Sequence, residues 1–392
     1  MARKVKDWIE GYVRFLENSE APDIYKTWTA ISTVASVLQR KVSLPWGTIT
    51  FYPNMYIILT GPSGCRKGTA MGPAYKMLND LGVKTAAEAI TREALIRELK
   101  NSAVMTADSD TNISYHSSLS IVSAELTVFL GYNNVQLMSD LTDWYDCRDR
   151  WIYRTKSQGT DEIIGVWVNL IGATTPSLIQ STLPRDAIGG GLTSRMIFVY
   201  AARKGKSVAT PFLSSYEMQL REDLVVDLER IGTLKGEYQV DESFLDVYVP
   251  WYGEQDKNPI FTDIRFGGYN ERRANHLLKL SMILNASRSD GNMVLTDHDF
   301  NKAKKIITVT ESVMPNVFSG IGKNDVSDVL SNVMTLVATK GTISFSDIMK
   351  EFYFDADKAT METIIDTLES MKFLQKVHSK DKGWFVRYLP QK

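Results

Sequence analysis

The sequence has few cysteines and histidines and no long apolar run, and each scarcity excludes a class of protein. Two cysteines, Cys65 and Cys147, cannot build a disulfide framework, and they fit a reducing, cytoplasmic setting. Only four histidines are present, which argues against a zinc centre. No apolar run approaches the roughly 18 residues of a membrane-spanning helix. The amino terminus, MARKVKDWIEGYV, lacks the apolar segment of a secretory signal, so we expect no membrane partner.

An excess of charge of one sign is also absent. Lys and Arg number 45 against 46 Asp and Glu, which leaves a net charge of −1 over 392 residues. This balance excludes a coat protein that binds nucleic acid through overall positive charge, so any such contact must come from a local patch. The hydrophobic fraction of 44% is typical of globular proteins. The length predicts two or three domains.

A glycine-rich loop follows an apolar segment of strand length. Residues 55–60 (MYIILT) have the pattern of a buried parallel strand, and helical spacing of apolar residues resumes over 69–81. A phosphate-binding loop needs small residues whose N–H groups face the phosphates, a lysine, and a helix N-terminus behind it. We therefore predict that this loop binds ATP; a plain strand-to-helix turn with a solvated lysine is the alternative. The predicted nucleotide-binding residues are Gly61, Pro62, Ser63, Gly64, Cys65, Arg66, Lys67, Gly68 and Thr69.

Two positions of this loop depart from the usual pattern. Arg66 stands where glycine normally precedes the lysine, and Gly68 stands where a hydroxyl normally holds Mg²⁺. Two residues are predicted to bind the metal. One is Thr69, one position after Gly68, and the other is Glu125, which follows a predicted strand at 119–123. We expect Glu125 to orient the attacking water; a carboxylate that merely favours a helix N-terminus is the alternative. Ala124 precedes it where an aspartate is common, so the expected metal shell is incomplete.

Polar residues also follow the next predicted strand, 163–171. Asn169, Thr174 and Thr175 are candidates for sensing the terminal phosphate, and Thr174 is our choice. For the two threonines, turn formation before Pro176 is the alternative.

Arginines near two later element boundaries complete the predicted site. Three glycines precede Arg195 at the start of an apolar strand, 196–201, and we expect this arginine to reach the nucleotide of a neighbouring subunit, ahead of Arg185. Arginines supplied in trans raise phosphoryl-transfer rates by ~10³–10⁵ in other systems. Arg272, at the start of a predicted helix over 269–288, is a candidate second sensor. An intramolecular salt bridge and a solvated helix face are the respective alternatives.

The last 70 residues have the order helix, strand, helix, helix, hairpin, which is that of a winged helix. Residues 323–371 carry four Lys or Arg against nine Asp or Glu, whereas 372–392 carry six against one. The positive charge therefore lies on the predicted wing, where Lys380, Lys382 and Trp384 occur, which suits contact with DNA phosphates rather than base reading. A protein-binding module is the open alternative.

With these motifs in hand, the chain resembles the P-loop ATPases that bacteriophages and mobile elements encode as helicase-like replication proteins. The resemblance covers about residues 20–310. It rests on YPN at 52–54, GPSGCRKGT at 61–69, IVSAEL at 121–126, NLIGATTP at 169–176 and GGGLTSRMIFVY at 189–200. It implies a RecA-like or AAA+-like core, ring assembly and DNA-dependent ATP hydrolysis with Mg²⁺.

The sequence as a whole predicts an α/β protein with a P-loop core, a parallel sheet and flanking helices. The expected parts are a helical region at 1–45, the P-loop NTPase core at 46–205, a mixed or helical lid-like region at 206–320 and a winged helix at 321–392. Within 206–320 we expect a helix at 215–232 and then a less regular stretch that leads to the helix at 269–288. We expect a hexameric ring in the cytoplasm that moves along single-stranded DNA, with loops at 102–118 and 148–160 on the strand. Arg148, Arg150, Arg154 and Lys156 interleave there with Trp151 and Tyr153; a hairpin with an aromatic core is the alternative. A helicase loader, initiator or regulator with weak hydrolysis is the second candidate, and a packaging or transposition motor the third.

Overall fold

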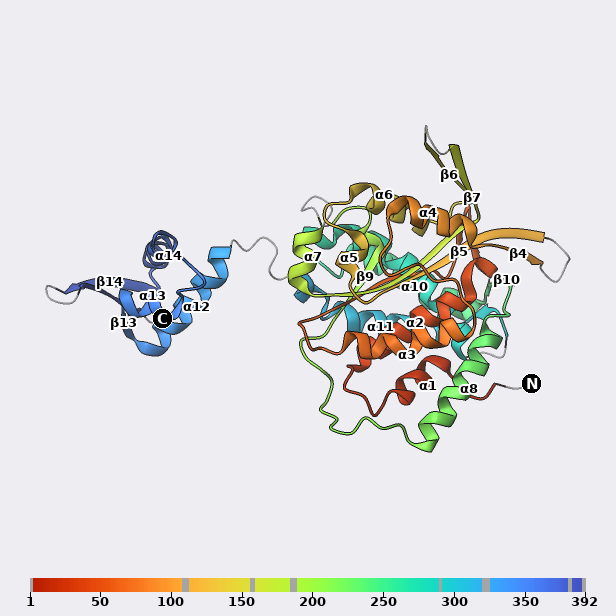
Figure 1. The fold of residues 1–392 in the computed structure, drawn as a ribbon, viewed down its shortest axis with the longest axis horizontal. Coiled ribbons are helices and arrows are strands. Elements are labelled where there is room, and N and C mark those ends of the chain that lie inside the picture. The colour runs from red at the N-terminus through yellow and green to blue at the C-terminus, as the bar shows by residue number, and fades with distance from the viewer. Residues whose placement is uncertain are drawn as a thin grey trace. The chain divides into compact units, whose positions relative to one another are not determined.

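The chain forms two compact units, 1–318 and 319–392. The three segments expected within 1–320 thus lie almost wholly in one unit, which holds the glycine-rich loop (Figure 1). Within the described chain, no helix combines the length and apolarity needed to cross a bilayer. The computed structural model describes residues 3–107, 113–155, 159–183, 189–288, 291–318, 325–379 and 383–389.

A five-stranded sheet forms the centre of the first unit, and four of its strands are parallel. Every residue of the two strands at its centre, β3 and β8, is buried, which explains their continuous apolar sequences. The prediction of an α/β fold with a parallel-containing sheet and flanking helices is confirmed. The strands, in spatial order, are β4 (Ala103–Ala107, antiparallel), β5 (Ile113–Ser123), β8 (Val166–Thr174), β3 (Tyr56–Thr60) and β9 (Met196–Tyr200).

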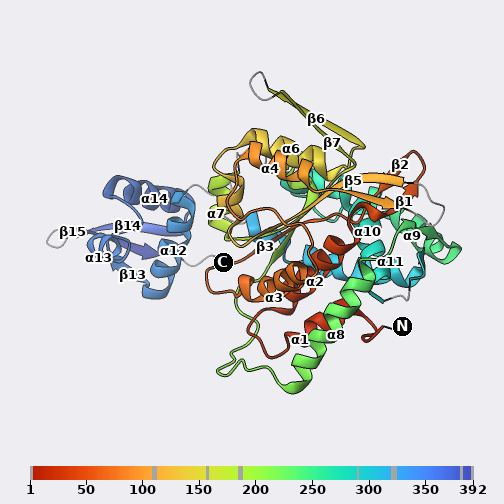
Figure 2. The same ribbon diagram turned by 45° about the vertical axis from the view of Figure 1, so that its right-hand side comes forward.

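Helices cover both faces of this sheet (Figures 1 and 2). The helix α2 packs directly on the sheet and is buried along most of its length, so its apolar residues surround it rather than forming one stripe. The helices near one face are α1 (Trp8–Phe15), α2 (Asp23–Leu38), α3 (Lys67–Asp80) and α8 (Ser215–Ile231), and those near the other are α4 (Arg92–Asn101), α5 (Leu126–Leu130) and α6 (Val135–Tyr145).

Further elements complete the first unit. The long helix α10 packs against α11, on the segment after β9 that was expected to be helical. The remaining elements are β1 (Val42–Trp46), β2 (Ile49–Phe51), β6 (Arg150–Thr155), β7 (Gly159–Ile164), α7 (Pro176–Thr182), β10 (Gly236–Glu237), β11 (Gln239–Val240), α9 (Glu242–Lys257), α10 (Gly267–Arg288), β12 (Val294–Leu295), α11 (Asp297–Glu311) and short 3-10 turns at 39–41, 193–195, 264–266 and 314–318.

Three sequence-based assignments were wrong. The polar segment 102–118, expected to be a mobile loop, contains β4 and the start of β5, in which Ser117, Ser118 and Ser120 are buried. The strand expected at 163–171 is β8 at 166–174, because Ile163 belongs to the β6–β7 hairpin. The irregular stretch expected before 269 contains α9, whose internal Pro250 masks its helical pattern.

The second unit has its own apolar core and the element order expected from the sequence. Its three strands pair in the order β13-β15-β14 against three helices. Fully buried residues of this core include Val333, Ile348, Met361 and Val386. The elements are α12 (Asp325–Lys340), β13 (Thr342–Ser344), α13 (Phe345–Glu351), α14 (Lys358–Ser370), β14 (Leu374–Ser379) and β15 (Gly383–Tyr388).

Candidate functional site

The glycine-rich loop joins the carboxyl end of β3 to the first turn of α3. Pro62, Ser63 and Gly64 are exposed, and Gly64 has a φ of +83°, a conformation in which glycine is unstrained. The fourteen-residue helix α3 begins at Lys67 directly behind them. The free N–H groups and the positive dipole end of such a helix attract anions. The predicted strand, loop and helix therefore occur in the arrangement that a phosphate-binding loop requires.

Gly61 is fixed at the base of the loop by close backbone packing. A Cβ at this position would lie 2.5 Å from the Tyr25 hydroxyl and still closer to the Ala201 carbonyl oxygen. Tyr25, from α2, donates a hydrogen bond of 2.7 Å to the Thr60 carbonyl oxygen and so supports the strand end beneath the loop. Cys65 is buried under the loop, and this burial raises the pKa of its thiol.

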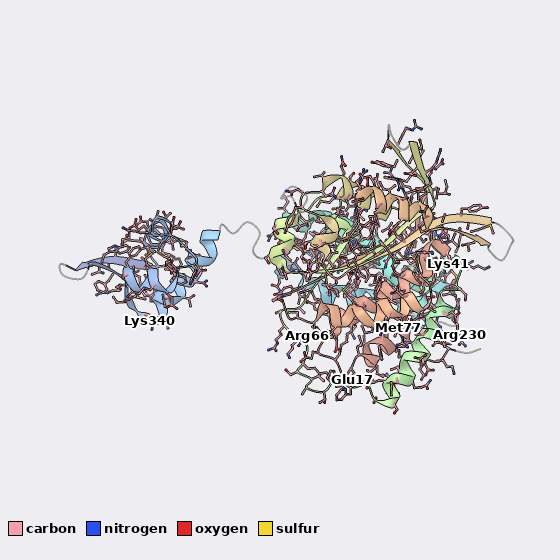
Figure 3. All side chains as sticks on the ribbon, in the orientation of Figure 1. Glu17, Lys41, Arg66, Met77, Arg230 and Lys340 are labelled. Carbon is pink, nitrogen blue, oxygen red and sulfur yellow. The ribbon has the colours of Figure 1, made fainter. Side chains whose placement is uncertain are left out.

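Arg66 adopts the left-handed conformation that its unusual position demands, with φ at +64° and ψ at +31°. Such a conformation is costly for a residue with a side chain. An ion pair of 2.6 Å with Glu20 holds the side chain, which lies at the surface (Figure 3). Glu20 also accepts from Lys204 at 2.5 Å and from the Val208 N–H at 3.2 Å. These bonds, led by that of Lys204, lower the pKa of Glu20 to about 2.

Lys67 turns its ammonium group onto the loop. Its Nζ donates to the carbonyl oxygens of Gly61 at 2.7 Å and Pro62 at 3.1 Å. Burial lowers the pKa of Lys67, and the charge of the nearby Glu125 carboxylate acts in the opposite direction. The ammonium group therefore lies against the backbone of the loop, near enough to Glu125 for the two charges to interact.

Glu125 follows the end of β5, across β8 from the loop. Ser123 pairs with Gly172, which pairs in turn with Ile58, so Glu125 lies about level with Thr60 at the same sheet edge. Two strand spacings separate β5 from β3, or roughly 10 Å. The exposed Glu125 is the N-cap residue of α5, yet its side chain makes no capping hydrogen bond. Glu125 therefore stands at a helix N-terminus, as the alternative expects, but its side chain does not cap the helix by a hydrogen bond.

The close approach of α5 to the sheet places Glu125. A Cβ on Gly172 would lie 2.8 Å from Leu126 Cδ1, so only glycine lets this helix pack so near to β8. Leu126 is buried there, directly after the exposed Glu125.

The three candidate sensors lie in different places. Thr174 is paired with Thr60, and its carbonyl oxygen accepts from the Gly61 N–H at 3.4 Å, so it adjoins the loop. Thr175 caps α7, which is the turn-forming role. Asn169 lies five residues before Thr174 on β8, and its side chain bonds the Met55 N–H at 2.9 Å and serines of α2. Asn169 therefore holds elements together and does not reach the loop.

The fit of the site to Mg²⁺ is partial. Thr69 is exposed in the first turn of α3, and Glu125 is exposed on the other side of the cradle. A hydroxyl and one carboxylate are suitable oxygen ligands, and Mg²⁺ commonly keeps several waters. A Cβ at Gly68 would meet nothing within 4 Å, so space exists beside Thr69. Among the described residues, no cluster of three His, Cys, Asp or Glu side chains could hold a metal by itself.

Arg195 and Arg272 lie at the opposite edge of the sheet from the loop. Met196 pairs with Tyr56 at the amino end of β3, roughly 16 Å of strand from Gly61. Arg195 is buried and donates two hydrogen bonds to the Asp146 carboxylate, from Nη2 at 2.5 Å and from Nε at 3.2 Å. Arg272 lies 3.7 Å from the same carboxylate. Neither arginine reaches the loop of its own chain; Arg185 lies outside the described residues.

Two antiparallel ribbons replace the loops that were expected to contact DNA (Figure 1). In the β6–β7 ribbon Trp151 is buried at 5.5 Å from the Trp144 ring, and Arg150 pairs with Glu162, so an aromatic core forms as in the alternative. The β4–β5 ribbon exposes Met105 and Tyr115, which face each other across the strands. Lys156 lies outside the described residues.

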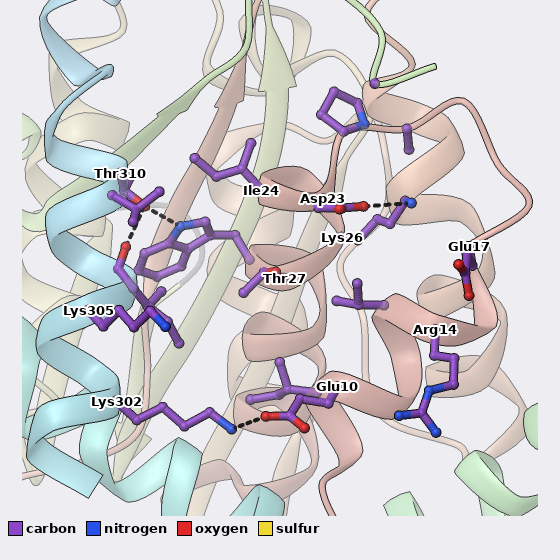
Figure 4. A pocket seen from close by; sticks show the side chains of 18 of the residues that line it. Glu10, Arg14, Glu17, Asp23, Ile24, Lys26, Thr27, Lys302, Lys305 and Thr310 are labelled. Carbon is purple, nitrogen blue, oxygen red and sulfur yellow. Dashed lines mark hydrogen bonds and ion pairs between the residues drawn. The ribbon is translucent and has the colours of Figure 1, made fainter. Parts of the chain in front are cut away.

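A cavity of about 1360 Å³ lies elsewhere in the first unit. It lies among α1, α2 and α11 and contains none of the predicted site residues. Its walls are tied by the Lys302–Glu10 pair at 2.7 Å and by the Trp28 Nε1 bond to Thr310 Oγ1 at 2.7 Å (Figure 4). These ion pairs and buried hydrogen bonds join α1 and α2 to α11, so the residues around the cavity serve to hold the helices together.

Sequence reasoning missed Glu20 and Tyr25, which support the loop from outside its motif. Glu20 bonds residues 46 and 184 positions away, and Tyr25 one 35 positions away. No motif or spacing within a short stretch of sequence could have predicted partners that lie so far apart in the chain. No protein-family model matches the chain, and no significant match is found among curated protein sequences.

Proposed function

We propose that this protein is an ATP-driven translocase or helicase of phage-type DNA replication, with a P-loop core and a carboxyl-terminal winged helix. One observation carries the proposal: Lys67, at the start of α3, and Glu125, after β5, lie at the same carboxyl edge of a parallel sheet, two strands apart. Phosphoryl transfer needs little more from a protein than positioned donors and a group that orients water.

In this proposal the loop N–H groups and Lys67 bind the phosphates, and Thr174 senses the terminal one. Glu125 orients water, and Thr69 with Glu125 would hold Mg²⁺, which supplies charge neutralisation when bound. Arg195 and Arg272 lie away from their own loop, as residues acting on a neighbour in a hexameric ring must. The exposed Tyr115 of the β4–β5 ribbon offers a base a stacking surface.

A nucleotide-binding helicase loader or regulator with weak hydrolysis is the second candidate. It is favoured by Ala124, which leaves the metal site with one carboxylate, and by Gly68, which lacks the usual hydroxyl. The ion pair of Arg195 with Asp146 also favours it. The acidic face of α14, with Glu362, Asp366 and Glu369, favours a protein partner over DNA for that helix.

Replacing Lys67 tests both candidates. Lys67→Ala is expected to weaken ATP binding at least a hundredfold, because it removes the cation whose ammonium group lies against the loop backbone. Lys76→Ala, an exposed lysine of the same helix, is the matched control and should bind ATP normally. Equal ATP affinity in both variants would refute the nucleotide site.

Turnover then separates the two candidates. ATP hydrolysis is measured with and without single-stranded DNA, and mass with ATP in the same buffer. DNA-stimulated hydrolysis by a ring supports the translocase, whereas tight binding without turnover supports the loader or regulator.

A further inference from the structure

A second cluster of cations lies at the amino edge of the sheet. One face of α10 presents Arg272, Asn275 and Lys279 at spacings of three and four residues into a cavity of about 230 Å³. Phe51, Tyr52 and Tyr145 form apolar walls of this amino-edge cavity. A cavity of about 150 Å³ is enough to hold benzene, so a small ligand fits here.

Lys279 is almost wholly buried without a carboxylate in contact. Its side chain is 5% exposed, and Nζ donates to Asn54 Oδ1 at 2.7 Å and the Asn54 carbonyl oxygen at 3.3 Å. The ammonium lies 3.8 Å from the centre of the Tyr145 ring. All three partners are neutral. A buried cation is costly unless an anion compensates it.

The cluster holds more positive than negative charge. Asp146 is the only carboxylate among the described residues that line the cavity, and Arg195 already binds it through two nitrogens. Arg272 reaches that carboxylate only at 3.7 Å. The charges of Arg195 and Asp146 cancel each other. The positive charges of Arg272 and Lys279 therefore remain for a ligand.

We propose that the amino-edge cavity binds a phosphate group, either free phosphate or the monoester of a small molecule, through Arg272, Asn275 and Lys279. A phosphomonoester carries about −1.5 to −2 charges near neutral pH, which matches the excess of two, whereas each phosphodiester of DNA carries one. The aromatic walls suit a ligand with a planar body. This site is distinct from the glycine-rich loop, and the proposal does not depend on ATP binding there. It assigns Arg272 to this cavity rather than to the nucleotide of a neighbouring subunit.

Calorimetry with inorganic phosphate in the Lys67→Ala protein tests the proposal, because that background weakens binding at the loop. One phosphate per chain should bind, and adding Arg272→Gln should weaken binding at least tenfold. Arg272 is half-buried and shares its carboxylate, so this variant is expected to fold; Lys279→Met is the second variant. Lys304→Gln, an exposed lysine on α11, is the control and should change nothing.

A second arm separates the two sources of phosphate. AMP that competes with phosphate in the Lys67→Ala background identifies a monoester ligand, whereas AMP that is excluded identifies free phosphate. The proposal is overturned if the Lys67→Ala protein binds no phosphate, if Arg272→Gln leaves binding unchanged, or if an oligonucleotide without terminal phosphates binds there in preference. A wild-type protein that binds phosphate in this cavity but binds no ATP would remove the proposed function alone.

Discussion

Single residues set the geometry of the loop, and Gly61 is the most constrained of them. Its Cα faces the Ala201 carbonyl and the Tyr25 hydroxyl so closely that a methyl group has no room. Gly61→Ala should therefore lower the free energy of unfolding by about 1–3 kcal/mol, the usual cost of overpacking. Denaturant unfolding measures this loss.

Gly68→Ala is the matched control for that substitution. Its Cβ would meet nothing within 4 Å, and alanine is the better helix former by roughly 1 kcal/mol. An unfolding free energy that falls equally in both variants would show that the packing around Gly61 is not what restricts it.

A second residue-scale prediction concerns His116. Burial, with the charges of Lys41 and Arg40, lowers the pKa of this histidine to about 4. Below about pH 6.5 the unfolded chain binds a proton that the folded one refuses, so stability is complete above that pH and falls as the pH decreases toward 4. Between pH 7 and pH 5, protonation of this histidine in the unfolded chain should lower the free energy of unfolding by about 1–2 kcal/mol.

His116→Gln should remove that part of the pH dependence. Its amide can still bond Thr106 and Ser118, which lie 3.1 and 2.8 Å from the imidazole nitrogens. Urea unfolding at pH 7 and pH 5 measures the difference, and carboxylates contribute equally to both proteins. An identical loss in the variant would mean that His116 takes up its proton in the folded state.

Between elements, a buried ion pair joins α10 to α11. Arg273 donates to Glu311 through Nε at 2.6 Å and Nη2 at 2.7 Å, and the two side chains are 8% and 1% exposed. Tyr269 adds a third bond at 3.0 Å. Glu311→Ala leaves the guanidinium buried without its partner and should cost about 3–5 kcal/mol in unfolding free energy.

The exposed pair Arg150–Glu162 on the β6–β7 ribbon supplies the comparison. Its side chains are 60% and 43% exposed, so Glu162→Ala should cost less than about 1 kcal/mol. If thermal unfolding showed equal losses for the two variants, α10 and α11 would be held by apolar packing rather than by this pair.

The elements that could be predicted from the sequence are those whose own residues show a pattern of burial. The strand β3 and the loop after it were recognisable because an apolar run, glycines and a lysine occur in series. The start of β5 was not, because buried serines read as a loop, and their pairing with β8 is a long-range property. The candidate site shows the same limit of sequence-based prediction. Lys67 and Glu125 could be selected from local motifs. Glu20, Tyr25 and Lys279 could not, because their roles depend on contacts with residues far away in the sequence.

At the scale of the whole molecule, two separate apolar cores predict two units that unfold separately. The second unit packs Val333, which is wholly buried, among residues of its own helices and strands. Val333→Asp places a charge in that core, so residues 325–389 should lose protection from hydrogen exchange while the strands β3 and β8 keep theirs. Ala338→Asp, at an exposed position of α12, should leave both units protected.

Nucleotide binding gives the same experiment a functional readout. If the loop of the first unit binds ATP by itself, the Val333→Asp protein should bind it with unchanged affinity and fail only in what the second unit supplies. DNA binding that disappears together with protection over 325–389 would assign the DNA contact to that unit. Loss of protection in β3 as well would show that the two cores depend on each other for stability, and would contradict the division of the chain into independently folded units.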